Sequence, residues 1–74
     1  MDLRPVFASN LQRIRHLRGL SQEELANDCG MSRSYLGHLE KGKFYVSVKI
    51  IGKLADVLAV DPAEFFRLKE KRKG

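Results

Sequence analysis

The sequence predicts an all-α domain built from short helices. Apolar residues recur three and four positions apart along most of the chain, which is the spacing of helices with one buried face. No segment shows the sustained alternation of apolar and polar residues that a half-buried strand requires. Glycine, proline and serine residues fall between the periodic segments, where they typically begin or end helices. These observations together predict five helices in one compact domain.

The first helix is expected over residues 5–18, with a left-handed stop at Gly19. Its apolar side is predicted to face the core, whereas the other side is basic. The apolar stripe consists of Phe7, Leu11, Ile14 and, at its end, Leu17 or Arg18.

Two short helices with a break between them are expected next. The first begins at Ser21, whose hydroxyl can accept a hydrogen bond from a free backbone amide while Glu24 reaches back, which is a capping box. Gly30 ends this helix, and Ser32 is placed to cap the following one, which ends near Gly42. The inward-facing residues of these two helices are Leu25, Ala26, Cys29, Leu36 and Leu39.

Ser47 is expected to cap a fourth helix. A fifth is predicted to begin at Asp61, because an acidic cap, Pro62 at the first helical position and Glu64 in the first turn are all typical of helix starts. Residues 1–68 form the predicted domain, and the basic residues 69–74 form a tail expected to be disordered. The apolar residues are Ile50 or Ile51, Leu54, Ala55 and Leu58 in the fourth helix, and Phe65, Phe66 and Leu68 in the fifth.

Length and composition are those of one small soluble domain. The chain has 74 residues, 43% of them hydrophobic and 31% charged. Cys29 has no second cysteine with which to pair, and no apolar run suits a membrane span or a signal peptide, which predicts a cytoplasmic protein without a membrane partner. The net charge of +5 comes from the two ends of the chain and favours a polyanionic partner without identifying it.

Two helices joined by a short glycine-containing turn, inside an all-α domain, form a helix-turn-helix, in which the second helix enters the major groove of DNA. With about 3.6 residues per turn, one side of that helix carries only small or polar residues, opposite Leu36 and Leu39. This outer side consists of Ser34, Gly37, His38 and Lys41.

The stretch LQRIRHLRGLSQEELANDCGMSRSYLGHLEKGK resembles the core of the phage-repressor and Cro type of helix-turn-helix proteins, also called the XRE family. The matching elements are GLSQEELA, a small residue with glycine, MSRSYL and LEKGK. The resemblance covers essentially the whole chain and implies a five-helix, lambda-repressor-like fold. It also implies a sequence-specific transcriptional regulator that binds a palindromic site in double-stranded DNA as a homodimer without a cofactor, similar to restriction-modification controller proteins.

The resemblance implies roles for individual residues. Arg15 and Glu40 match a pair that joins the first helix to the third and sets its angle, and Val46 stands where the family often has proline, which leaves the path of that loop open. The residues matched to base-reading positions are Arg33, Ser34, Tyr35, Gly37 and His38, and those matched to phosphate contacts are Gln22, Ser32, Lys41 and Lys43.

The chain has more large apolar side chains near its last two helices than a core of this size can hold. Those left outside would form an apolar patch of the kind that marks an interface. A two-fold dimer would place its recognition helices about 34 Å apart, one turn of the duplex. The predicted interface residues are Phe44, Tyr45, Val46, Phe65 and Phe66, of which Phe65 is also expected in the core.

The histidines and serines also have simpler explanations. His38 is alternatively a plain solvent-exposed residue, and His16 is best explained as surface. A metal site from His16, Cys29 and His38 is not expected, because Cys29 belongs to the core while the histidines face outward. The serines are explained as caps and no nucleophile with a base accompanies them, so no enzymatic activity is predicted.

The main alternative function is that of an antitoxin or another protein-interaction module. Such a protein would bind a partner protein and use DNA only for its own regulation. An RNA-binding module is less favoured, because the aromatic stacking platform of single-strand readers is missing from the sequence.

Overall fold

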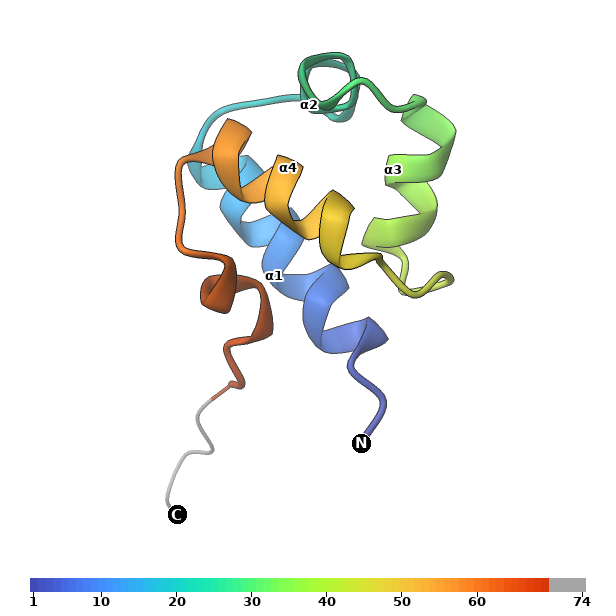
Figure 1. Cartoon of the computed structure of the whole chain (residues 1–74), viewed down its shortest axis with the longest axis vertical. Coiled ribbons are helices and arrows are strands. Elements are labelled where there is room, and N and C mark those ends of the chain that lie inside the picture. Colours follow the sequence, from blue (N-terminus) through green and yellow to red (C-terminus); the bar gives the residue numbers. More distant parts are fainter. Residues whose placement is uncertain (70–74) are drawn as a thin grey trace.

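The computed structural model describes residues 1–69, and within them the chain forms four α-helices and one short 3₁₀ helix, with no strand. The predicted all-α class is therefore confirmed. Of the predicted tail, only Lys69 lies within the described residues. The elements are α1 (Arg4–Leu17), α2 (Gln22–Cys29), α3 (Arg33–Glu40), α4 (Val48–Leu58) and the 3₁₀ helix η1 (Pro62–Phe66), shown in Figure 1.

α1 lies at the centre of the arrangement. It contacts α3 on one side and η1 on the other, while α2 packs against both α3 and α4 (Figure 1). The apolar stripes of all five elements meet in a single core, as predicted from their spacing. Its buried members are Phe7, Leu11, Ile14, Leu25, Ala26, Cys29, Leu36, Leu39, Leu54, Ala55, Leu58 and Phe65.

The capping box predicted at the start of α2 is confirmed. The Ser21 hydroxyl accepts a hydrogen bond from the Glu24 amide at 3.0 Å, and the Ser21 amide donates to the Glu24 carboxylate at 2.8 Å. The Ser21 amide holds the pKa of the Glu24 carboxyl below its ordinary value of 4.5. The ionised box is therefore fully stabilising above about pH 4.5, and that contribution is lost as the pH falls through the lowered pKa.

The other three predicted caps are also present. The hydroxyls of Ser32 and Ser47 each accept a hydrogen bond from the backbone amide three residues later, at 3.0 and 3.1 Å. Asp61 Oδ1 accepts from the Ala63 amide at 2.9 Å. Each of these side chains satisfies an amide that the start of a helix leaves free, so the boundaries of α3, α4 and η1 are set locally.

The predicted five-helix count is wrong, because the last element is a single 3₁₀ segment. The Glu64 amide donates to the Asp61 carbonyl at 2.9 Å, which is the short i to i+3 bond of a 3₁₀ helix. Two apolar residues expected on inner faces also lie outside, since Leu17 is 70% exposed and Leu68 is 55% exposed. Arg18 instead donates to the carbonyls of Leu58 and Ala59, at the end of α4.

Candidate DNA-binding surface

α3 presents a polar outer face while its apolar residues are buried. Leu36 and Leu39 are fully buried, whereas Arg33 and Ser34 at the start of the helix are exposed. Gly30, with φ of +69°, adopts the left-handed conformation that glycine tolerates and turns the chain from α2 into α3. We call the five residues predicted to read bases the reading face, namely Arg33, Ser34, Tyr35, Gly37 and His38.

A buried ion pair joins α1 to the end of α3, as predicted. Arg15 Nε and Nη2 donate to the two carboxylate oxygens of Glu40 at 2.6 and 3.0 Å, and the side chains are 9% and 2% exposed. This two-point geometry fixes the direction of both side chains. Arg15 Nη1 also donates to the Leu20 carbonyl at 2.9 Å, so the pair ties the loop before α2 as well.

Two glutamines complete this network. Gln22 Nε2, at the start of α2, donates to the Glu40 carboxylate at 3.0 Å, and Gln12 Nε2, on α1, donates to the Glu40 backbone carbonyl at 2.7 Å. The Gln22 side-chain amide, predicted to contact phosphate, therefore already has an internal partner. The role of Gln12 was not predicted from the sequence, because only the packing of α1 against α3 brings it near Glu40.

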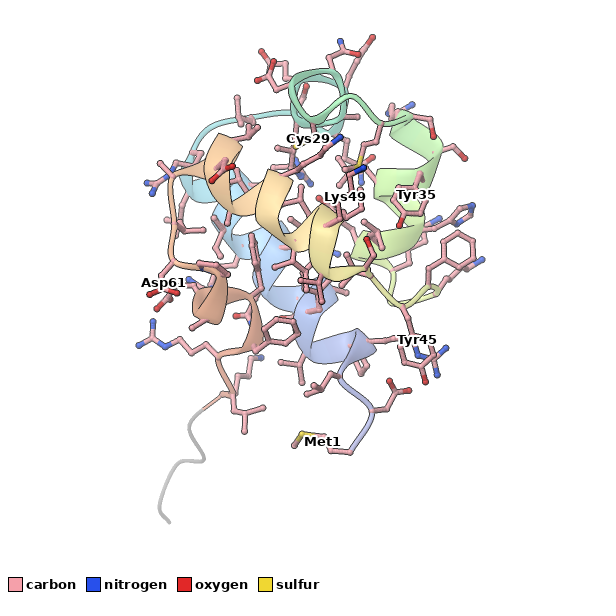
Figure 2. All side chains as sticks on the ribbon, viewed as in Figure 1. Met1, Cys29, Tyr35, Tyr45, Lys49 and Asp61 are labelled. Atoms are coloured by element: carbon pink, nitrogen blue, oxygen red, sulfur yellow. The ribbon has the colours of Figure 1, made fainter. Side chains whose placement is uncertain are left out.

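The basic residues after α3 lie on the surface beside the reading face. Lys41 and Lys43 are exposed, with the left-handed Gly42 between them. Figure 2 shows Tyr35 on α3 and Tyr45 on the following loop on the same side of the molecule. The loop therefore extends the surface that α3 begins.

An apolar groove of about 230 Å³ lies between this loop and the start of α1. Tyr45 on its rim is 73% exposed and packs under the Arg4 guanidinium, 4.4 Å from the ring centroid. Hydrogen bonds from Arg4 lower the pKa of the Asp2 carboxyl to about 2. The groove is lined by Leu3, Arg4, Phe7, Phe44, Tyr45, Val46, Ile51 and Phe66.

Phe65 does not belong to any exposed interface, contrary to its predicted interface role. It is 0% exposed, and its ring packs 5.3 Å from that of Phe7 inside the core. Val46 and Phe66 are half-buried and pack against that core. Among the predicted interface residues, Phe44 and Tyr45 are therefore the most accessible, at 45% and 73% exposure.

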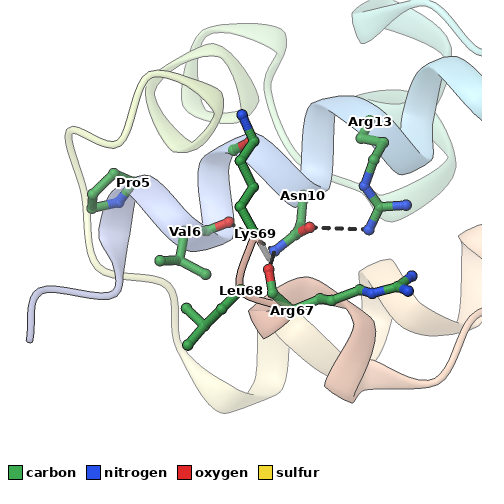
Figure 3. Close-up of a pocket in the computed structure, with 8 residues that line it drawn as sticks. Pro5, Val6, Asn10, Arg13, Arg67, Leu68 and Lys69 are labelled. Carbon is green, nitrogen blue, oxygen red and sulfur yellow. Dashed lines mark hydrogen bonds between the residues drawn. The ribbon is translucent and has the colours of Figure 1, made fainter. Parts of the chain in front are cut away.

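A second, larger groove of about 780 Å³ lies on the other side of α1, next to the segment after η1 (Figure 3). Its polar centre is Asn10, whose Nδ2 donates to the carbonyls of Val6, Phe65 and Arg67 at 2.9 to 3.0 Å. Arg13 donates to Asn10 Oδ1 at 3.0 Å, as Figure 3 also shows. Because the Asn10 amide is committed to these bonds, its role is to attach the C-terminal segment to α1.

Within the part of the chain that the structure describes, neither histidine belongs to a cluster that could hold a metal ion. Across residues 1–69, no three His, Cys, Asp or Glu side chains gather as they would around a metal ion. Cys29 is buried, and burial raises the pKa of its thiol, so it remains a neutral, small hydrophobic residue. In the same range, no helix is both long and apolar enough to cross a membrane.

Comparison with known proteins places this surface in a family. The helix-turn-helix family model HTH_3 matches residues 11–65, which include α2, α3 and α4. A hypothetical transcription factor of Neisseria meningitidis is 41% identical over 59 residues, which are 80% of this chain and 56% of that protein. An uncharacterised HTH-type transcriptional regulator of Sinorhizobium fredii is 39% identical over 86% of this chain and 83% of its own length.

A solved structure gives the same result. The restriction-modification controller protein C.AhdI from Aeromonas hydrophila aligns with a TM-score of 0.80 and 44% sequence identity, over 84% of this chain and 94% of that one. Its similarity in sequence and backbone agrees with the family match. The chain thus belongs to the XRE-type helix-turn-helix family of DNA-binding proteins, which includes transcriptional regulators and restriction-modification controller proteins.

Proposed function

We propose that the protein is a sequence-specific regulator that binds a palindromic operator as a homodimer, with α3 of each copy in the major groove. The observation that carries this proposal is the reading face, held at a set angle by the buried pair of Arg15 and Glu40. An α-helix with a polar outer face and a rigid attachment suits the width of the major groove.

Base reading is assigned to the reading face. Arg33, exposed in the first turn of α3, carries the planar donor fork that pairs with O6 and N7 of guanine. Ser34 beside it both donates and accepts, so it tolerates several bases. Tyr35 and His38 lie along the same helix, and Gly37 between them has no side chain to keep the backbone away from DNA.

Phosphate contacts are assigned to residues around the reading face. Lys41 and Lys43 are exposed beyond the end of α3 and would attract the DNA backbone without reading sequence. Ser32 and Gln22 lie at the starts of α3 and α2, where free backbone amides favour an anion. Since the Gln22 Nε2 donates to Glu40, we assign this contact to the start of α2 as a whole.

The second copy is assigned to the apolar groove around Phe44, Tyr45, Val46 and Phe66. None of the residues that line this groove belongs to α3, so a two-fold partner seated in it would contact the loop and the start of α1. Spacing of about 34 Å between the two helices would match successive major grooves on one face of DNA.

Selection from a random duplex library at about 150 mM salt tests the proposal, with Arg33→Ala run in parallel. We expect a two-fold symmetric motif with half-sites about one helical turn apart, and a loss of preference at one symmetric position in the variant. Arg13→Ala is the matched control, because it removes the same charge from an exposed position in the groove on the other side of α1. A folded wild-type protein that enriches no sequence would refute the proposal.

A further inference from the structure

Phe44 follows α3 in sequence but packs back onto the reading face. Its ring centroid is 4.9 Å from that of His38, in an edge-to-face arrangement, and 6.1 Å from that of Tyr35, with the ring planes only 28° apart. Tyr35 and His38 are three residues apart and therefore neighbours on the helix surface. One side chain from the loop thus bridges two of the residues assigned to base reading.

The backbone places Phe44 there. Gly42, with φ of +73°, reverses the chain at the end of α3. The Gly42 amide donates to the Leu39 carbonyl at 3.1 Å and the Lys43 amide to the His38 carbonyl at 3.0 Å, which together form a Schellman motif. The next residue is Phe44, which is 45% exposed. Its position is therefore set by this turn rather than by filling the core.

A second, independent observation concerns the hydrogen bonding of the His38 ring. Its Nδ1 is buried and has no hydrogen-bond partner within residues 1–69. A buried N–H without an acceptor is rare in proteins, because its desolvation is not compensated. In the neutral imidazole the hydrogen is therefore expected on Nε2, which leaves Nδ1 with only a lone pair. The half-buried ring can then donate one hydrogen bond, from Nε2.

We propose that Phe44 is a positioning residue for DNA reading, which holds Tyr35 and His38 in place and keeps the His38 imidazole as an Nε2–H donor. This inference rests on the proposed function. In the major groove such a donor pairs with the acceptor atoms of guanine, adenine or thymine, whereas the edge of cytosine offers a donor. The base that His38 contacts is thus expected to be any of the first three.

Variants at Phe44 and its neighbours test this inference in the library selection. We expect Phe44→Ala to lose preference by about tenfold at the same base pair that His38→Ala affects, and the double variant to lose no more than His38→Ala alone. Phe44→Leu keeps apolar volume and the fold but lacks the ring, so it is expected to lose part of the preference. Leu68→Ala is the matched control, because it removes an exposed apolar side chain from the groove on the other side of α1.

A measurement without DNA separates the two proposals. Long-range proton–nitrogen NMR spectra of the free protein report the tautomer of His38, and we expect Nε2–H in the wild type and a mixture of tautomers in Phe44→Ala. An unchanged base preference in folded Phe44→Ala, or Nδ1–H in the wild type, overturns this inference and leaves the proposed function standing. A wild type that enriches no sequence refutes the proposed function, and the NMR result then still decides whether Phe44 controls His38.

Discussion

Glu40 accepts three side-chain hydrogen bonds, two from Arg15 and one from Gln22. Its carboxylate is almost completely buried, so each bond replaces water that the charge has lost. The attraction within such a pair does not by itself guarantee net stability, but removing one partner leaves a buried charge without compensation. At the scale of single residues, this carboxylate therefore links the stability of the fold to the angle of α3.

The first prediction concerns Arg15. We expect Arg15→Ala to lower the free energy of unfolding by about 3–5 kcal/mol, measured by urea denaturation, and to weaken DNA binding because α3 loses its attachment. Arg15→Lys, which keeps the charge but not the two-point geometry, should fall between this variant and the wild type. Arg13→Ala serves as the exposed control. Unchanged unfolding together with unchanged DNA affinity in Arg15→Ala would contradict the assigned role.

The helices show which parts of the fold a sequence alone reveals. The caps at Ser21, Ser32, Ser47 and Asp61 depend on the few residues around them, and all were predicted correctly. The last element was also predicted as an α-helix, because the cap at Asp61 is as typical of a helix start as the serine caps are. It extends for only five residues and packs against α1, and a cap determines where a helix begins but not how far it continues.

The candidate site likewise has features that the sequence predicts and features that depend on the folded structure. The pair of Arg15 and Glu40 was predicted from the family resemblance, and the exposed face of α3 from the helical periodicity. The packing of Phe44 on His38 and Tyr35 does not, because it depends on where the loop after Gly42 returns. Phe44 was predicted as an interface residue, and only its position in the fold adds the contact with the reading face.

At the scale of one element, Gly37 in α3 allows the effect of a glycine on helix stability to be compared with its effect on DNA binding. A Cβ added there meets no atom within 4 Å, and the same holds for Gly52 in α4. Because glycine in a helix interior costs about 1 kcal/mol relative to alanine, both Gly37→Ala and Gly52→Ala should raise the free energy of unfolding by up to that amount. Thermal denaturation of the two variants measures this directly.

The two alanine variants, Gly37→Ala and Gly52→Ala, are expected to differ in their affinity for DNA. If Gly37 allows the backbone of α3 to approach DNA closely, Gly37→Ala should bind the selected operator more weakly despite its greater stability. Gly52→Ala should bind as the wild type does, since it lies on α4 and outside the reading face. Equal affinity of Gly37→Ala and the wild type would mean that the glycine plays no part in DNA contact.

At the scale of the whole molecule, α1 is attached to α3, which carries the reading face, and also forms part of the proposed dimer surface. Through Arg15 it holds α3, and through Asn10 it holds the segment that follows η1. The start of the same helix forms one wall of the apolar groove assigned to the second copy. The reading face and the proposed dimer surface are thus attached to one rigid element, which is what a fixed spacing between two half-sites requires.

The last prediction tests that dimer surface through Tyr45. Because the side chain is 73% exposed, Tyr45→Glu should not disturb the core, but it would place a carboxylate against an apolar partner surface, which is costly without a compensating bond. We expect the dimer dissociation constant, measured by sedimentation velocity, to rise at least about tenfold, since about 1.4 kcal/mol suffices for that change. As dimerisation weakens, the affinity for an operator with two half-sites should fall with it, whereas the affinity for a single half-site should not change.

Leu17→Glu is the matched control, because Leu17 is 70% exposed at the far end of α1 from the groove. At about 1.5 Å per residue, that end lies roughly 20 Å from Arg4, so a charge there should leave dimerisation unchanged. Equal dimerisation of Tyr45→Glu and the wild type would place the partner surface elsewhere. If both variants weaken dimerisation, the added negative charge is the cause, and the result would not identify the groove as the dimer surface.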